Sequence, residues 1–210
     1  MKAEYVTHTG DDLFVVNVAR HSFSKTSEEF NDKDQRLIYY LAKHGHWSPF
    51  SHCNITLRMK APVPIRTQCF KHKVGFAENE ESRRYISSTP ELFIPEYFRN
   101  APPEGQNKQG SIGKHHRNDH WLNMYTARAN DCMWTYISMI EDGVCPEQAR
   151  FILPQGVMVN WIWTGSLMAY ARFYNQRTDP HAQKEIQDLA EQVGDIIEPL
   201  FPISWKVLTQ

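Results

Sequence analysis

The sequence lacks the marks of several common protein classes. Its 210 residues carry 23 basic and 24 acidic side chains, a net charge of -1, so there is no basic field for a nucleic-acid polymer. No apolar run approaches the roughly 20 residues that cross a bilayer, and the first residues form no apolar signal segment. We therefore expect a soluble, cytoplasmic protein without membrane or nucleic-acid partners.

Common catalytic and cofactor motifs are also missing. There is no GxGxxG, GxxxxGK or GxSxG, which argues against a Rossmann fingerprint, a P-loop and a nucleophile elbow. The four cysteines have no CxxC spacing and lie in apolar contexts, which favours reduced packing residues over a catalytic thiol. His116 and His120 have the spacing to share a helix face, but no Cys or carboxylate stands at ligand spacing, so we expect no metal site.

What is present is the composition of a folded protein, 41% hydrophobic and 12% aromatic, without repeats. Residues 1–210 are predicted to form one domain. EYVTHTG (4–10) is a candidate edge strand, and CNITLRMKAPV (53–63) a strand in which apolar residues alternate. Helices are predicted over 32–44, 64–73, 117–141, 146–153, 159–174 and 181–197, and a flexible loop over 101–113. Strands and helices do not alternate regularly, so the predicted class is α+β, a mixed α/β fold with a small sheet.

One short span, TQCFKHKVGFAENEESRRY (67–85), concentrates charges of both signs. If its first part is helical, three polar residues share a face: Gln68, Lys71 and His72. If its last part is extended, side chains alternate between two faces, with Glu80, Ser82 and Arg84 on one and Glu81 and Arg83 on the other. Arginines grip phosphates bidentately, so this span can hold a nucleotide phosphate. A salt-bridged surface is the alternative.

Two later segments add polar residues in helical contexts. Glu147 and Arg150 lie three residues apart on a predicted helix, where an ion pair on the helix surface is the simpler interpretation. In RTDPHAQKEIQ, Arg177 and His181 flank the Asp179–Pro180 start of another helix. The three segments together are more specific than any one of them.

Taken in order, these segments resemble the flavin-dependent thymidylate synthases. The hallmark of that family is an Arg-His-Arg triplet followed after seven residues by Ser, and here Lys71-His72-Lys73 is followed after eight residues by Ser82. Six further matching segments are spread over most of residues 13–205: ARHSF (19–23), HGHWSPFSH (44–52), APVPIRTQCF (61–70), NEESRRY (79–85), EQARFILP (147–154) and RTDPHAQKEI (177–186).

The resemblance implies a small antiparallel sheet packed with long helices, assembled as a homotetramer with active sites where subunits meet. It also implies the chemistry: FAD-dependent methylation of dUMP to dTMP, with methylenetetrahydrofolate as carbon donor and NADPH as reductant.

Carried over position by position, the resemblance implies two overlapping sets of site residues. The FAD contacts are Ser22, His52, Lys71, His72, Lys73, Glu80, Ser166 and Arg172. The dUMP contacts are Gln68, Lys71, Glu80, Glu81, Ser82, Arg83, Arg84, Arg150 and Arg177. Arg177 is also the expected catalytic residue, because a guanidinium against the pyrimidine stabilises negative charge on the ring. No enzyme nucleophile and no metal are then required.

The chain also departs from the family pattern. Lysines replace both arginines of the triplet, which keeps the charge but loses the planar fork. Arg83 stands where Gly is common, Cys69 where Trp is usual, and Ser166 and Arg172 fall at two usual Asn positions. Two alternatives therefore stay open: methylation or hydroxymethylation of another pyrimidine nucleotide such as dCMP, and a nucleotide- or flavin-binding protein without turnover.

Overall fold

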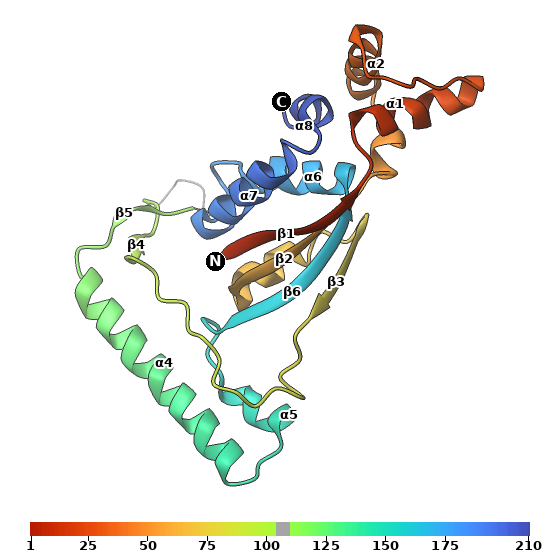
Figure 1. The fold of residues 1–210 in the computed structure, drawn as a ribbon. Coiled ribbons are helices and arrows are strands. Elements are labelled where there is room, and N and C mark those ends of the chain that lie inside the picture. Colours follow the sequence, from red (N-terminus) through yellow and green to blue (C-terminus); the bar gives the residue numbers. More distant parts are fainter. Residues whose placement is uncertain (104–109) are drawn as a thin grey trace.

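A four-stranded antiparallel sheet forms the centre of the protein. The computed structural model describes residues 1–103 and 110–210 (Figure 1). The strands lie in the order β1-β2-β6-β3: β1 (Lys2–Thr9), β2 (Asn54–Pro62), β6 (Met158–Ser166) and β3 (Phe76–Glu80). A separate short ladder pairs β4 (Arg99–Asn100) with β5 (Ile112–Lys114).

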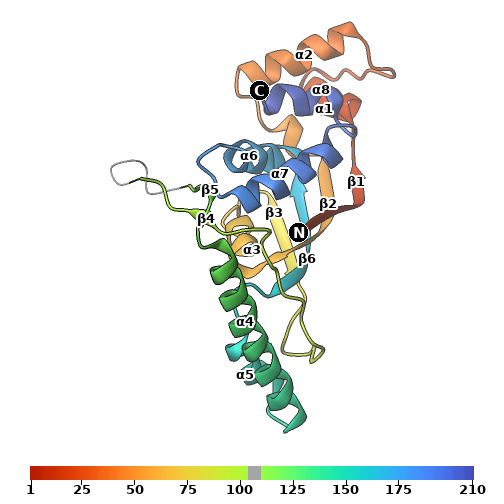
Figure 2. The ribbon, with the colours of Figure 1, turned by 90° about the vertical axis from the view of Figure 1, so that its left-hand side faces the viewer.

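Helices cover one face of the sheet and extend from both of its ends (Figures 1 and 2). The covering helices are α3 (Val63–Cys69), α6 (Leu167–Arg177) and α7 (Lys184–Ile197). At one end α1 (Asp12–Arg20), α2 (Asp32–Lys43) and α8 (Pro202–Leu208) pack together. At the other end stand the long α4 (Asn118–Glu141) and the short α5 (Pro146–Ala149). Among the described helices, none has both the length and the apolar character needed to cross a membrane.

The core lies between the sheet and α6 and α7. From β2 and β6, Leu57, Trp161 and Trp163 point into it, and the buried side of α7 is the predicted stripe that includes Ile186 and Leu189. Trp163 is surrounded by three rings: Phe76 stacks on it at 4.1 Å, and Tyr170 and Phe173 meet it edge-on.

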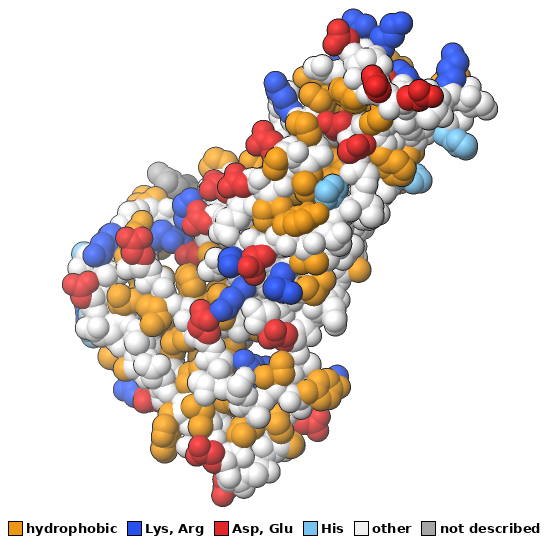
Figure 3. All heavy atoms as spheres, in the orientation of Figure 1, with side chains coloured by type: hydrophobic (Ala, Val, Ile, Leu, Met, Phe, Trp, Pro, Cys, Tyr) orange, Lys and Arg blue, Asp and Glu red, His pale blue; other side chains and the backbone are white. Residues whose placement is uncertain are grey.

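The opposite face of the sheet is polar. Thr56, Arg58 and Lys60 of β2 alternate with its buried residues, and Thr164 of β6 lies opposite Thr56. Figure 3 shows acidic and basic side chains mixed over this part of the surface. Within the described residues no helix covers this face.

The predicted helix over 159–174 is wrong, because its first half is strand β6. Val159, Trp161 and Trp163 are buried at a period of two while the residues between them are only partly buried, which is the pattern of a strand. The helix α6 starts only at Leu167, where the hydroxyl of Ser166 accepts a hydrogen bond from the backbone N–H of Ala169.

Two smaller expectations also need correction. The extended stretch through Arg84 ends at Glu80, and the backbone N–H groups of Tyr85 and Ile86 turn back to donate to the Ser82 carbonyl. Of the predicted loop over 101–113, residues 104–109 lie outside the described part of the chain, and its end belongs to strand β5. The predicted helices over 32–44, 117–141 and 181–197 are confirmed as α2, α4 and α7, the last of which begins only at Lys184.

Candidate active site

The last turn of α6 carries Arg177, and its guanidinium is held by groups from α3 and the residues that follow it. Its Nε donates to Nε2 of His72 at 2.9 Å, its Nη2 to the backbone carbonyl of Gln68 at 3.3 Å, and its Nη1 to the Gln68 side-chain oxygen at 3.5 Å. All three acceptors are neutral. The positive charge of Arg177 is therefore fixed in place without being neutralised by them.

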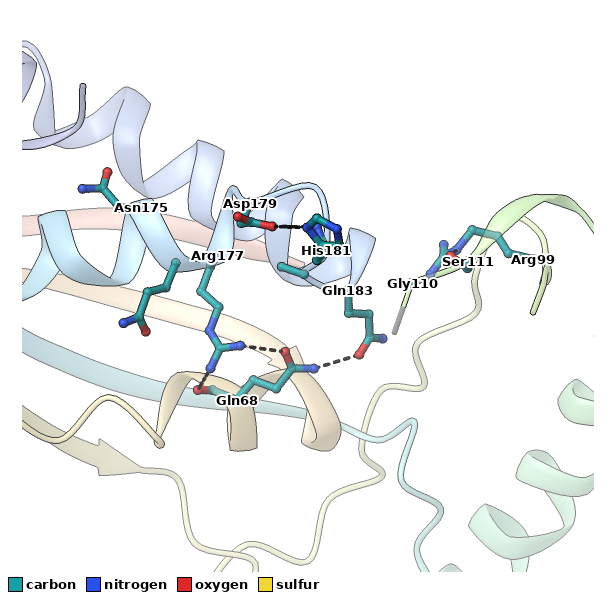
Figure 4. Close-up of a pocket in the computed structure, with 11 residues that line it drawn as sticks. Gln68, Arg99, Gly110, Ser111, Asn175, Arg177, Asp179, His181 and Gln183 are labelled. Atoms are coloured by element: carbon teal, nitrogen blue, oxygen red, sulfur yellow. Dashed lines mark hydrogen bonds and ion pairs between the residues drawn. The ribbon is translucent and has the colours of Figure 1, made fainter. Parts of the chain in front are cut away.

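The network continues from Gln68 into α7 and β4. Its Nε2 donates to Oε1 of Gln183 at 2.8 Å, Nε2 of Gln183 donates to Glu185 at 2.9 Å, and Glu185 pairs with Arg99 at 2.7 Å. Most of these residues line a cavity of about 790 Å³, together with Asp179 and His181 (Figure 4). Segments far apart in the sequence thus build one wall.

His72 is neutral in this arrangement. Burial, and then the positive charge of Arg177, lower its pKa to about 4. Because its Nε2 accepts from Arg177, the ring proton is on Nδ1, and no side chain of the described chain accepts from that nitrogen. The ring of Phe173 meets the imidazole edge-on at 5.1 Å and holds its orientation.

A second cavity, of about 480 Å³, gathers the residues at the end of β3. It is lined by the predicted dUMP contacts Glu80, Glu81, Ser82, Arg83 and Arg150. The Glu81 carboxylate accepts from Nδ2 of Asn160 at 2.9 Å, which ties this turn to β6. The expected Glu147–Arg150 ion pair does not form between these described residues, because Nε of Arg150 donates to the backbone carbonyl of Glu147 at 3.2 Å.

The remaining predicted dUMP and FAD contacts lie outside these two cavities. Lys71 and Lys73 follow α3 and are exposed, with Lys73 ion-paired to Glu78. Arg84 bonds to Tyr85, and its backbone N–H donates to the Ser82 hydroxyl at 3.3 Å.

Four predicted FAD contacts lie along the side of the fold formed by α1 and α6. Ser22 is in a 3-10 turn after α1, His52 stands before β2, and Arg172 is exposed on α6. Ser166 is buried and its hydroxyl caps α6, so it reaches neither cavity. As FAD contacts these four stay predictions.

Two of the four cysteines, Cys53 and Cys69, are buried. Burial raises the pKa of the Cys53 and Cys69 thiols to about 12, so neither forms a thiolate near neutral pH. In the parts of the chain that the structure covers, no three His, Cys, Asp or Glu side chains come together as metal ligands.

Sequence reasoning missed Gln183, Glu185 and Arg99. A signal existed for the first two, because both lie in the segment RTDPHAQKEI that carries Arg177. For Arg99 no local signal existed, because its pairing with Glu185 joins residues 86 positions apart.

The fold and the site define an α+β protein with two neighbouring cavities, each lined by arginine side chains. The profile of the family described as thymidylate synthase complementing protein (Thy1) matches residues 4–203. The flavin-dependent thymidylate synthase of Thermosipho africanus is 33% identical over 193 residues, 92% of this chain and 84% of that protein. That of Thermotoga neapolitana is 34% identical over 203 residues, 97% and 88% of the two chains.

The structural comparison agrees. The crystal structure of the UMP/dUMP methylase PolB from Streptomyces cacaoi with 5-Br dUMP matches with a TM-score of 0.88 at 27% identity, over 99% of this chain and 94% of that one. The chain belongs to the flavin-dependent thymidylate synthase family. The resemblance and the α+β class expected from the sequence are confirmed, and the chain is an enzyme of that kind.

Proposed function

We propose that the protein methylates dUMP to dTMP in a flavin-dependent reaction, with the pyrimidine held against Arg177. The observation that carries this proposal is the guanidinium fixed by neutral acceptors at the wall of the 790 Å³ cavity. A positive charge fixed before the reaction stabilises the anionic form of the ring, and this makes the neighbouring ring carbon nucleophilic. Family membership and the nucleotide analogue in the related structure support the same chemistry.

The phosphate of the nucleotide is assigned to the second cavity. Ser82 offers a hydroxyl, and Arg83 and Arg150 offer guanidinium groups, which match phosphate oxygens geometrically. Because the two cavities share no lining residue in one chain, we propose that the complete site forms between chains, in a homotetramer. Each pyrimidine then contacts Arg177 of one subunit while its phosphate contacts Ser82 of another.

A mixing experiment tests this shared site. Two variants, Arg177→Ala and Ser82→Ala/Arg150→Ala, should each be inactive alone. Mixed and reassembled, they should regain part of the wild-type turnover, because some sites then combine two intact halves. If mixed oligomers form but stay inactive, each site lies within one chain.

The residues that follow α3 fit a flavin cofactor in charge and hydrogen bonding. The Lys71 ammonium has no carboxylate partner in the described chain and can meet a diphosphate, while Nδ1 of His72 is a free donor. We assign Lys71 and His72 to FAD on these grounds. Lys73 is partly neutralised by Glu78, and we assign it a weaker contact. Bound there, the reduced flavin would supply hydride to the transferred one-carbon group. Methylenetetrahydrofolate as carbon donor and NADPH as reductant complete the proposal.

A second candidate substrate is UMP. The UMP/dUMP methylase was also solved with 5-Br UMP, and that structure matches this chain with a TM-score of 0.87. The alternative pyrimidine nucleotide dCMP is compared with both.

The deciding experiment follows NADPH oxidation and methylated product with dUMP, UMP and dCMP in parallel, using FAD-loaded protein. We expect dUMP to give the highest kcat/KM. Turnover with dCMP and none with dUMP would refute the assigned base. A colourless protein that takes up no added FAD would refute the flavin chemistry.

A further inference from the structure

The helix α3 separates the two cavities and contributes one polar side chain to each. Gln68 lines the 790 Å³ cavity, whereas Arg66 lines the 480 Å³ cavity beside Ser82 and Arg150. Ile65 and Cys69 of the same helix are buried in the core, which fixes its orientation. Arg66 is outside the set of contacts implied by the family resemblance.

Two interactions hold the Arg66 side chain. Its Nε is 2.9 Å from Oε2 of Glu80, an ion pair whose angles fall outside hydrogen-bond geometry. Its Cζ also lies 5.2 Å from the centre of the Phe70 ring, one turn further along the chain. The side chain is only 24% exposed. Within the described chain neither Nη atom makes a hydrogen bond, so both remain available to a ligand in the cavity.

The same arrangement is repeated next to it. Lys73 pairs with Glu78 and lies 5.4 Å from the Phe70 ring, while Glu78 and Glu80 project from the same side of β3. Two ion pairs around one aromatic ring therefore dock the α3 segment onto β3. This docking holds the Arg66 fork in place before any ligand arrives, which lowers the entropy lost on binding.

Charge in the second cavity also depends on Arg66. Its lining holds two carboxylates, Glu80 and Glu81, and three guanidinium groups, Arg66, Arg83 and Arg150. Without Arg66 these charges would cancel, and a dianionic phosphate would meet no net attraction. Burial raises the pKa of Glu80 and the Arg66 charge lowers it, so the two groups are also coupled electrostatically.

We propose that Arg66 is a further nucleotide-binding residue, whose two Nη groups contact the 5′-phosphate of the pyrimidine nucleotide while its Nε stays on Glu80. Arg66 supplies a planar guanidinium group, which the Lys71-His72-Lys73 triplet lacks. The inference rests on the proposed function, because it names a phosphate contact for that same substrate.

The test compares the dissociation constants of dUMP and deoxyuridine for the FAD-loaded protein, measured by calorimetry or by competition. The Kd of deoxyuridine divided by the Kd of dUMP is the ratio that isolates the contribution of the phosphate. Arg66→Met should reduce this ratio about 10- to 100-fold, the value of one charge-assisted contact, and Arg66→Lys should reduce it less. Arg36→Met, at an exposed position on α2, is the matched control and should leave the ratio unchanged.

Glu80→Gln separates binding from a purely structural ion pair. It removes the same ion pair and one negative charge from the cavity lining but keeps the guanidinium, so the ratio should rise or hold rather than fall, whereas a purely structural ion pair predicts the same loss as in Arg66→Met. The double variant Arg66→Met/Glu80→Gln avoids an unpaired, partly buried carboxylate and should still show a reduced ratio relative to Glu80→Gln, even if Arg66→Met alone folds poorly.

The outcomes distinguish this inference from the proposed function. If wild-type protein binds dUMP and the ratio is unchanged in both variants that lack Arg66, then Arg66 has only a structural role. An equal loss in Glu80→Gln would also refute a direct phosphate contact. If wild-type protein binds no pyrimidine nucleotide, the proposed function fails, and the role of Arg66 fails with it.

Discussion

Replacing Arg177 by Met tests the central electrostatic argument. The change removes a guanidinium held by Nε2 of His72 and by two oxygens of Gln68 but keeps an unbranched side chain of similar length. Loss of one fixed donor aimed at developing negative charge typically costs about 10²–10³ in kcat, or roughly 3–4 kcal/mol. We expect a loss of this size, with a smaller change in the KM for dUMP because the phosphate contacts lie in the other cavity.

The same variant gives a second, independent signal at His72. Burial and the Arg177 charge together hold the pKa of this imidazole at about 4. Removing the charge leaves burial alone, so the pKa should rise and yet remain below its ordinary value of about 6.5. NMR titration of the His72 resonance measures this rise without requiring turnover.

Three measurements complete the test of Arg177. The flavin absorbance of the purified variant should match that of wild-type protein, which shows that the fold and cofactor site survive. Arg177→Lys should recover part of the activity, because it restores charge without the fork. Undiminished dTMP formation by Arg177→Met would remove Arg177 from the mechanism, and an unchanged His72 pKa would contradict the contact itself.

Three further changes probe stability and the thiols. The pKa of His72 is lowered to about 4 in the folded state, so the unfolded chain binds this proton first as the pH falls. The free energy of unfolding should therefore fall by about 1–2 kcal/mol between pH 6.5 and pH 4. Urea unfolding of His72→Gln should show less of this loss. Gly165→Ala would place a Cβ 2.3 Å from Cε1 of Phe76 and should lower the free energy of unfolding by about 1–3 kcal/mol. A lower Tm measures this loss, and an unchanged Tm would mean that the Phe76 ring is free to move. Cys69→Ala should keep its kcat, because that thiol has a pKa of about 12; an inactive but folded variant would contradict this.

The parts of the fold that follow from local pattern were predictable. The apolar stripe of α7 repeats every three to four residues and is buried as expected, and the alternation in β2 gives its inner face. The strand β6 was missed although Trp161 and Trp163 alternate correctly, because the helix α6 begins directly after Ser166 with no loop between the two elements. Two apolar segments separated only by Thr164-Gly165-Ser166 do not by themselves distinguish a strand followed by a helix from one longer helix.

For the candidate site too, some features could be predicted from the sequence and others could not. Residues such as Gln68 and Arg177 could be named from the sequence because their segments match a family pattern, yet their contact joins positions 109 apart. No spacing rule predicts such a contact, and none predicts that Arg66 meets Glu80. The turn after Glu80 was missed because no Gly, Pro or Asn marks it in Glu80-Glu81-Ser82-Arg83-Arg84, whereas the chain there folds back onto the Ser82 carbonyl.

The changed triplet has a physical consequence that depends on α3. Lys73 is paired with Glu78 and helps to dock the α3 segment, which leaves Lys71 as the lysine of the triplet with no carboxylate partner among the described residues. The planar fork is instead at Arg66, five positions earlier in the chain and facing the other cavity. Lys73 contacts the Glu78 carboxylate through a single ammonium group. Arg66 can hold Glu80 through Nε and still direct its two Nη groups at a phosphate. An arginine at position 73 would therefore still be held by Glu78, and the fork that faces the second cavity would remain that of Arg66.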